Sequence, residues 1–68
     1  MSKVLKNNIY ELRQEKKITQ EELGSFVSVS RQTIISIEKG NYTPSVGLAI
    51  LFAKFFNIPV EKIFWYDK

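Results

Sequence analysis

The amino-acid sequence predicts an all-α fold, a compact five-helix bundle that forms a single domain over residues 1–68. Two observations support this prediction. Capping and turn residues divide the chain into short segments at close intervals. Within those segments, apolar residues recur three and four positions apart, as they do along amphipathic helices. We find no repeat, low-complexity stretch or linker that would indicate a second domain.

The first two helices have recognisable starts. The first is expected to begin after Asn7 or Asn8, either of which can act as N-cap, and to end near Lys16 or Lys17. The second is expected to begin at Thr19, because a threonine followed three residues later by a glutamate (Glu22) is a capping-box pattern. Its apolar stripe consists of Leu23, Phe26 and Val27.

Capping and turn residues also mark the limits of the remaining helices. The third is expected to run from Ser30 as N-cap to Gly40, a residue suited to a left-handed C′ position. The fourth starts at Ser45 and runs to about Phe56. A brief fifth helix follows Pro59, a residue that favours the opening of a helix.

The composition excludes several classes of function. The chain is 44% hydrophobic and 25% charged, which is typical of a folded protein. It contains no cysteine and no histidine, so it lacks disulfides, the usual zinc ligands and the commonest general base. Its seven carboxylates form no evident catalytic pair. We therefore expect no enzyme activity, no metal site and no cofactor, and the sequence indicates no small-molecule ligand.

The charge and hydropathy patterns indicate the surroundings of the protein. The net charge of +3 mildly favours a polyanionic partner. No apolar run reaches the roughly 18 residues of a membrane span. The N-terminal stretch MSKVLKNNIYEL lacks the apolar core of a secretory signal. The expected location is the cytoplasm, without membrane association.

The stretch SRQTIISIEKG, residues 30–40, has an unusual polar face. With a helical advance of about 100° per residue, the residues on its inner side are Thr33, Ile34 and Ile37, and those on its outer side are Arg31, Gln32, Ile35, Ser36 and Lys39. The plain alternative is a solvated face. However, arginine and glutamine can each form two hydrogen bonds to a base edge, and an isoleucine can contact a thymine methyl group. This face therefore favours contact with DNA bases.

The segment before this helix supports the same interpretation. Residues 20–39 form a helix, a short turn and a second helix, with the small residue Gly24 where the two helices must approach closely. A helix-turn-helix unit has this arrangement, and its second helix enters the major groove of DNA.

The stretch QEELGSFVSVSRQTIISIEKGNYTPS resembles the Cro/CI-type helix-turn-helix repressors, especially the small stand-alone dimeric members. The resemblance extends from about Asn8 to Phe64. It implies a lambda-repressor-like DNA-binding domain. Two departures concern the fold: Gly24 stands where the family usually has alanine, and Ser28 where many members have glycine. A third, Ile35, stands where polar residues are common, so the base preference cannot be transferred.

The resemblance also implies roles for individual residues. Base contacts are expected from Arg31, Gln32, Ile35 and Ser36, and backbone contacts from Gln20, Ser30, Thr33, Lys39, Asn41 and Tyr42. The second group has alternatives: hydration alone for Gln20, a helix-cap role for the hydroxyls of Ser30 and Thr33, and packing for Tyr42. Arg13 and Glu38 are expected to form an ion pair that holds the recognition helix against the first helix.

The fourth helix carries two apolar stripes, more than a small monomer usually covers. The fifth helix and the tail can cover the second stripe, or a homodimer can. The dimer interpretation assigns the interface to Leu48, Leu51, Phe52, Phe55, Phe64 and Trp65. The ends of the chain are β-favouring at residues 3–5 and 64–66. Some small family members have a terminal β-ribbon, and disordered ends are the alternative.

The sequence therefore predicts a bacterial- or phage-type transcriptional regulator that binds double-stranded DNA. The most specific form of this prediction is a repressor that binds a palindromic operator as a homodimer. The alternative is a protein-interaction module, such as an antitoxin-like protein that neutralises a partner.

Overall fold

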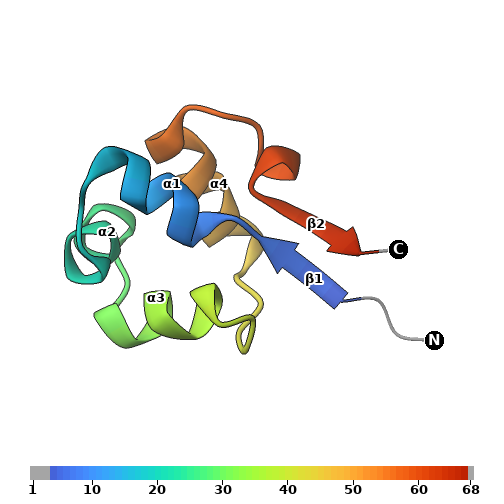
Figure 1. Cartoon of the computed structure of the whole chain (residues 1–68), viewed down its shortest axis with the longest axis horizontal. Helices are drawn as coiled ribbons and strands as arrows, with labels where there is room; N and C mark the ends of the chain where they lie inside the picture. The colour runs from blue at the N-terminus through green and yellow to red at the C-terminus, as the bar shows by residue number, and fades with distance from the viewer. Residues whose placement is uncertain (1–3, 68) are drawn as a thin grey trace.

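The computed structural model describes residues 4–67, and its helices form a cluster from which two strands project (Figure 1). The elements in chain order are β1 (Val4–Asn7), α1 (Ile9–Lys16), α2 (Gln20–Val27), α3 (Arg31–Glu38), α4 (Val46–Phe56), a 3-10 helix (Val60–Lys62) and β2 (Phe64–Asp67). Among residues 4–67, no helix is both long and apolar enough to cross a lipid bilayer.

Three of the predicted N-caps are confirmed by side-chain hydrogen bonds. The hydroxyl of Thr19 accepts from the amide of Glu22 at 3.0 Å, and the Glu22 carboxylate accepts from the amide of Thr19 at 2.8 Å, which completes the capping box. Ser30 and Ser45 likewise accept from the third residue of their helices, at 3.2 and 3.1 Å. Each bond satisfies an amide that has no partner within its helix.

The start of α1 has a different arrangement. Asn8 occupies the N-cap position, but its side chain makes no cap hydrogen bond. Instead, Oδ1 of Asn7 accepts from the amide of Ile9 at 3.0 Å. The Asn8 amide group donates to the carbonyl of Lys62 at 3.1 Å, so this asparagine joins α1 to the 3-10 helix.

Several helices end in the left-handed region of backbone space. The residues with positive φ are Lys17 (57°), Ser28 (65°), Asn57 (59°) and the predicted C′ glycine, Gly40 (81°). Glycine has no Cβ and adopts this conformation without strain, and asparagine tolerates it. Lys17, after α1, and Ser28, in the turn between α2 and α3, are neither glycine nor asparagine and so occupy strained positions.

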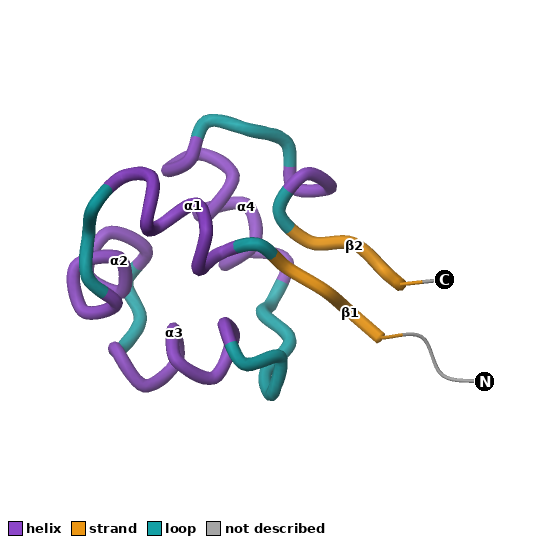
Figure 2. The backbone as a smooth tube through the Cα atoms, viewed as in Figure 1, coloured by secondary structure: helices purple, strands orange, loops and turns teal. Residues whose placement is uncertain are grey.

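The predicted helical fold is confirmed in part, but the predicted count of five helices is not. Four α-helices are present in residues 4–67, and the expected fifth is a single 3-10 turn at Val60–Lys62. In addition, β1 and β2 pair antiparallel with Val4 opposite Asp67 and Asn7 opposite Phe64 (Figure 2). The alternative of a terminal ribbon is therefore confirmed for the described residues, whereas Lys3 lies outside them.

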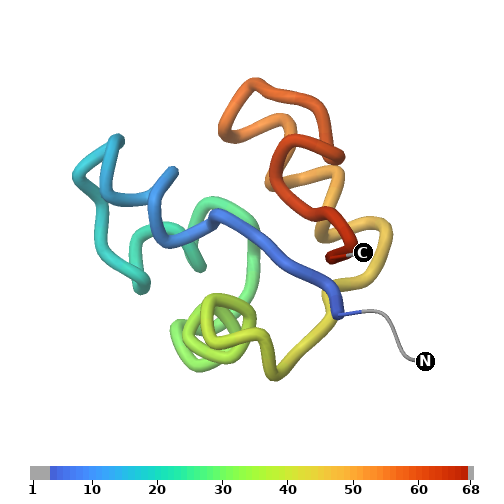
Figure 3. Tube along the Cα trace, turned by 45° about the vertical axis from the view of Figure 1, so that its right-hand side comes forward, coloured from blue at the N-terminus to red at the C-terminus, as the bar shows by residue number. Residues whose placement is uncertain are grey.

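The hydrophobic core lies where the helices and the base of the ribbon meet. In Figure 3, α3 is seen nearly end-on beneath α1, while α4 lies on the other side of the core. The buried apolar side chains are Ile9, Leu23, Val27, Ile34, Ile37, Leu48, Phe52, Phe56, Ile63 and Phe64. Each of the four α-helices contributes to this set, as do Ile63, which follows the 3-10 helix, and Phe64 of β2, so β2 is part of the core.

The structure corrects half of the predicted dimer interface. Leu48, Phe52 and Phe64 are buried in the core of the single chain and are not available to a partner. Phe55 is half-buried and stacks on Phe26, with ring centroids 4.8 Å apart. Because both faces of α4 are apolar, helical periodicity could not distinguish the inner face from the outer one.

Other side chains form the exposed apolar surface of α4. Val46 is 79% exposed, Ile50 46% and Leu51 42%. Trp65, which belongs to the predicted interface, is 43% exposed on β2. An exposed apolar surface therefore exists, and it combines Leu51 and Trp65, which were predicted for the interface, with Val46 and Ile50, which were not.

Candidate nucleic-acid interface

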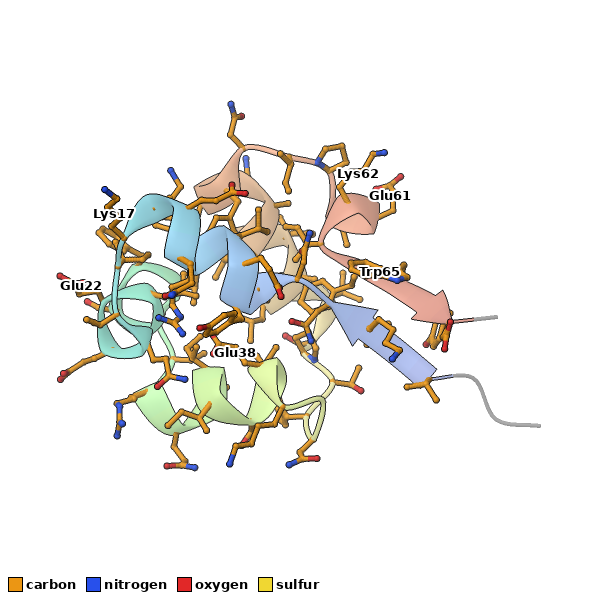
Figure 4. All side chains as sticks on the ribbon, viewed as in Figure 1. Lys17, Glu22, Glu38, Glu61, Lys62 and Trp65 are labelled. Atoms are coloured by element: carbon orange, nitrogen blue, oxygen red, sulfur yellow. The ribbon has the colours of Figure 1, made fainter. Side chains whose placement is uncertain are left out.

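The helix α3 exposes one polar face and buries the other. Ile34 and Ile37 are fully buried, whereas Arg31 and Gln32 are exposed and Ile35 and Ser36 are partly exposed. Figure 4 shows side chains of α3 pointing away from the remaining helices. The four predicted base-contacting residues thus lie on one accessible surface. The predicted inner residue Thr33 is half-buried.

This surface has unused hydrogen-bonding capacity. Within residues 4–67, the side chains of Arg31, Gln32 and Ser36 form no hydrogen bond or ion pair with one another or with other side chains. A guanidinium group offers five donors in a planar fork, and a glutamine amide offers both donors and an acceptor. The first turn of α3 therefore presents the groups that can form paired hydrogen bonds with guanine and adenine edges.

The start of α3 is fixed by its cap. The hydroxyls of Ser30 and Thr33 lie 3.1 Å apart and are hydrogen-bonded, and Ser30 also caps the Thr33 amide. The turn before it is tight, because the amide of Val29 donates to the carbonyl of Gly24 at 2.8 Å. A Cβ at Gly24 would lie 2.6 Å from the Val29 carbonyl oxygen, so glycine permits this close approach.

The end of α3 is held by a buried ion pair. Nε of Arg13 lies 2.7 Å from Oε2 of Glu38, and Nη2 lies 3.2 Å from Oε1, which gives a two-pronged contact. The two side chains are only 10% and 7% exposed. Nη1 of Arg13 also donates to the carbonyl of Ile18 at 3.1 Å. The pair joins α1, the loop after it and α3, and Figure 4 places Glu38 between α3 and α1.

The ion pair affects the acid–base behaviour of Arg13. Its hydrogen bond with Glu38 raises the pKa of the Arg13 guanidinium above its ordinary value, despite the opposing effect of burial. The stabilisation linked to the charge of Arg13 is therefore complete below the unfolded pKa of arginine and is lost as the pH rises through the raised pKa of the folded state. Arg13 therefore stays protonated near neutral pH, and pH changes in that range do not affect the ion pair by titrating it.

Gln20 has a partner that its sequence position did not reveal. Its Nε2 donates to Oε1 of Glu38 at 3.1 Å, and the side chain is half-buried. The carboxylate of Glu38 therefore accepts hydrogen bonds from both α1 and α2. The sequence supplied a glutamine at the start of α2, but no local signal connected it to a residue at the end of α3.

The loop after α3 carries the remaining predicted backbone contacts. Lys39, Asn41 and Tyr42 are all exposed. The loop is attached to α3 by main-chain bonds from Gly40 to Ile37 and from Asn41 to Ser36, each 2.9 Å long. Asn7 of β1, which the sequence suggested only as a cap, also donates to the Ile37 carbonyl at 2.9 Å. The ribbon is thus tied to the last turn of α3.

Comparison with known proteins agrees with this geometry. Residues 9–63 match the sequence profile of the helix-turn-helix family of the Cro/CI type. The match covers most of the chain, from the first residue of α1 to the residue before β2, and includes α2, α3 and the loop after α3.

Individual relatives align over almost the whole chain. An HTH-type transcriptional regulator of Methanocaldococcus jannaschii is 49% identical over 63 residues, which are 93% of this chain and 96% of the relative. An HTH-type transcriptional regulator of Bacillus subtilis is 44% identical, with 94% and 97% covered. The transcriptional repressor RstR of a cryptic phage of Vibrio cholerae is 30% identical, and the aligned part is 84% of this chain and 51% of RstR.

Proposed function

Because the chain belongs to the Cro/CI-type helix-turn-helix family of DNA-binding transcriptional regulators, we propose that it is a repressor that binds a palindromic operator as a homodimer. In this proposal α3 lies in the major groove, and the first turn of α3 reads the bases. The repressor assignment is also supported by the relative RstR, which is itself a transcriptional repressor.

One observation carries the proposal: the outer face of α3 combines exposure with uncommitted hydrogen-bonding groups. Arg31 and Gln32 are exposed and, among the described residues, form no side-chain hydrogen bond or ion pair. By contrast, Glu38 is withdrawn from this face by Arg13. The face thus presents cationic and amide groups to a polyanion, and no exposed carboxylate lies at the centre of the face.

Gln32 tests the base-reading role. Replacing Gln32 with alanine removes both a donor and an acceptor from an exposed position, so the fold should be unaffected. We expect specific binding to weaken by about 1–3 kcal/mol and the preference at one base position to relax. Binding of labelled duplexes, one with each base at each operator position, measures both effects. Unchanged affinity and preference would remove Gln32 from the interface.

Lys39 tests the backbone-contact role. It is exposed immediately after α3, and it forms no ion pair with any residue in 4–67. Lys39→Ala should weaken binding to operator and random duplexes by similar factors. It should also reduce the slope of log affinity against log salt concentration by about 0.9, the value for one released counterion. The control is Lys62→Ala, in the 3-10 helix, which should leave the slope unchanged.

Asn41 and Tyr42, on the same exposed loop, are proposed as further backbone contacts. Ser30 and Thr33 already use their hydroxyls in the cap of α3, so we assign them mainly to that cap.

The homodimer proposal uses the exposed surface of α4. Val46, Ile50 and Leu51 form this surface, and only Lys54 adds a charge on the same side. Ile50 also borders a shallow hollow lined by Ala53, Ile58, Pro59 and Val60. A two-fold axis beside α4 would bury the same residues on both chains. It would place the two α3 helices about one DNA turn apart, ~34–36 Å.

A further inference from the structure

We infer that Gln20 is a positioning residue, which sets the orientation of α3 for base reading through its hydrogen bond to Glu38. This inference rests on the proposed function, because it concerns how α3 is presented to DNA. It differs from a phosphate contact, the role that the position of Gln20 suggested, since the partner of its amide lies within the protein.

The first argument is the position of the bond in the helix-turn-helix unit. The turn at residues 28–30 joins the last residue of α2 to the first residue of α3. The hydrogen bond between Gln20 and Glu38 joins the first residue of α2 to the last residue of α3, at 3.1 Å. The two helices are therefore connected twice, by the turn and by this hydrogen bond. Both connections hold the angle between α2 and α3.

The second argument is the environment of the acceptor. The side chain of Glu38 is 7% exposed, and its Oε1 accepts from Nη2 of Arg13 at 3.2 Å as well as from Gln20. A hydrogen bond to a buried charged group contributes more than one between neutral groups in water. Arg13 links α3 to α1, whereas Gln20 is the residue that links this carboxylate to α2.

The third argument concerns what the bond does for recognition. Bidentate contacts to base edges require side chains at defined positions and angles, so a small rotation of α3 weakens them. Contacts to phosphates tolerate such a rotation better, because they depend mainly on charge. Loss of the Gln20 bond should therefore lower affinity for the operator and leave affinity for random DNA nearly unchanged.

The experiment uses the full-length protein with Gln20→Met, since methionine keeps the length and packing of glutamine but cannot donate a hydrogen bond. The matched control is Gln14→Met, an exposed glutamine of α1 that lies 3.5 Å from Arg13 Nη1. Affinities are measured for the operator obtained by selection and for a random duplex. We expect Gln20→Met to lose about five- to tenfold on the operator. Its loss on the random duplex should stay within about twofold, because phosphate contacts are preserved.

Equal losses on both duplexes would overturn the inference and identify Gln20 as a phosphate contact. The absence of any loss, or an equal loss in Gln14→Met, would also overturn it. If the unmodified protein showed no sequence preference, the proposed function would fail. Hydrogen exchange of the free protein would then decide whether Gln20 positions α3. Faster exchange of α3 amides than of α4 amides in Gln20→Met supports positioning, and unchanged exchange contradicts it.

Discussion

At the scale of single residues, the backbone of Ser28 is strained, as is that of Lys17. The φ of Ser28, 65°, lies in the left-handed region, where a residue with a Cβ is less stable by about 1–2 kcal/mol. Ser28→Gly removes this strain but adds backbone entropy to the unfolded chain, about 0.5–1 kcal/mol. We expect a net stabilisation of about 0.5–1 kcal/mol, measured by urea unfolding. Ser25→Gly, within α2, should destabilise instead, and a loss of stability in Ser28→Gly would contradict the account.

The two helical glycines should respond in opposite ways to alanine. At Gly24 a Cβ would meet the Val29 carbonyl oxygen at 2.6 Å, whereas at Gly47 its nearest neighbour is Ser45 Oγ at 3.9 Å. The helix propensity of alanine alone favours both substitutions by about 1 kcal/mol. We expect Gly47→Ala to stabilise the protein and Gly24→Ala to destabilise it by about 1 kcal/mol, because overpacking there exceeds the propensity gain. Thermal unfolding of both variants compares the two effects directly.

The sequence showed that Gly24 and Ser28 depart from the family pattern, but it could not show how each affects the stability of the fold. The sequence placed the small residue Gly24 where α2 and α3 must approach closely, at a position where the family usually has alanine. The structure shows that the glycine admits the carbonyl of Val29, a contact that depends on the path of the turn. The departures at positions 24 and 28 both lie in this turn, and local propensity could not indicate how they combine.

At the scale of elements, the stability of α3 depends on the buried pair formed by Arg13 and Glu38. Glu38→Ala leaves the Arg13 guanidinium buried without its carboxylate, and breaking a buried pair in this way costs about 3–5 kcal/mol. Such a loss is a large fraction of the stability of a small domain. We expect a marked fall in the urea midpoint. The control is Glu15→Ala, an exposed residue of α1, which should change the midpoint little; equal effects in the two variants would refute the role.

Helix boundaries were predicted well because their signals are local. The capping box at Thr19, the serine caps and Gly40 are each encoded within a few neighbouring residues, and all appear in the structure. The fifth helix failed because only a few residues separate Pro59 from the start of β2. The ribbon pairs Val4 with Asp67 across almost the entire chain, so propensity suggested strands at the ends but could not prove their pairing.

At the scale of the whole molecule, some apolar residues of α4 stabilise the fold of the single chain, and others form the surface proposed for dimerisation. Phe52 is fully buried, so Phe52→Ala should destabilise the single chain by about 3–5 kcal/mol. Ile50 is 46% exposed, so Ile50→Glu should leave the fold intact but place a charge in the proposed interface. Sedimentation equilibrium at micromolar concentration should show a dimer for the unmodified protein and a monomer for Ile50→Glu. A monomeric unmodified protein would reject the dimer.

The sequence could not assign that interface because α4 is apolar on nearly every side. Which stripe faces inward depends on how α4 packs against the other helices and on the tail, where Phe64 enters the core. The exposed face of α3 was easier to predict. Arg31, Gln32 and Ser36 follow one side of the helix and the buried Ile34 and Ile37 the other, so periodicity separated the two sides.

The central claim is that the outer face of α3 reads a DNA sequence, and selection from a random duplex pool tests it most directly. The selection is performed at about 150 mM salt, where non-specific phosphate attraction is weakened. The account predicts enrichment of a palindrome with half-sites about 10 base pairs apart. It also predicts that Gln32→Ala relaxes one position in each half-site. Failure of the unmodified protein to enrich any sequence would contradict the claim and turn attention to a protein partner.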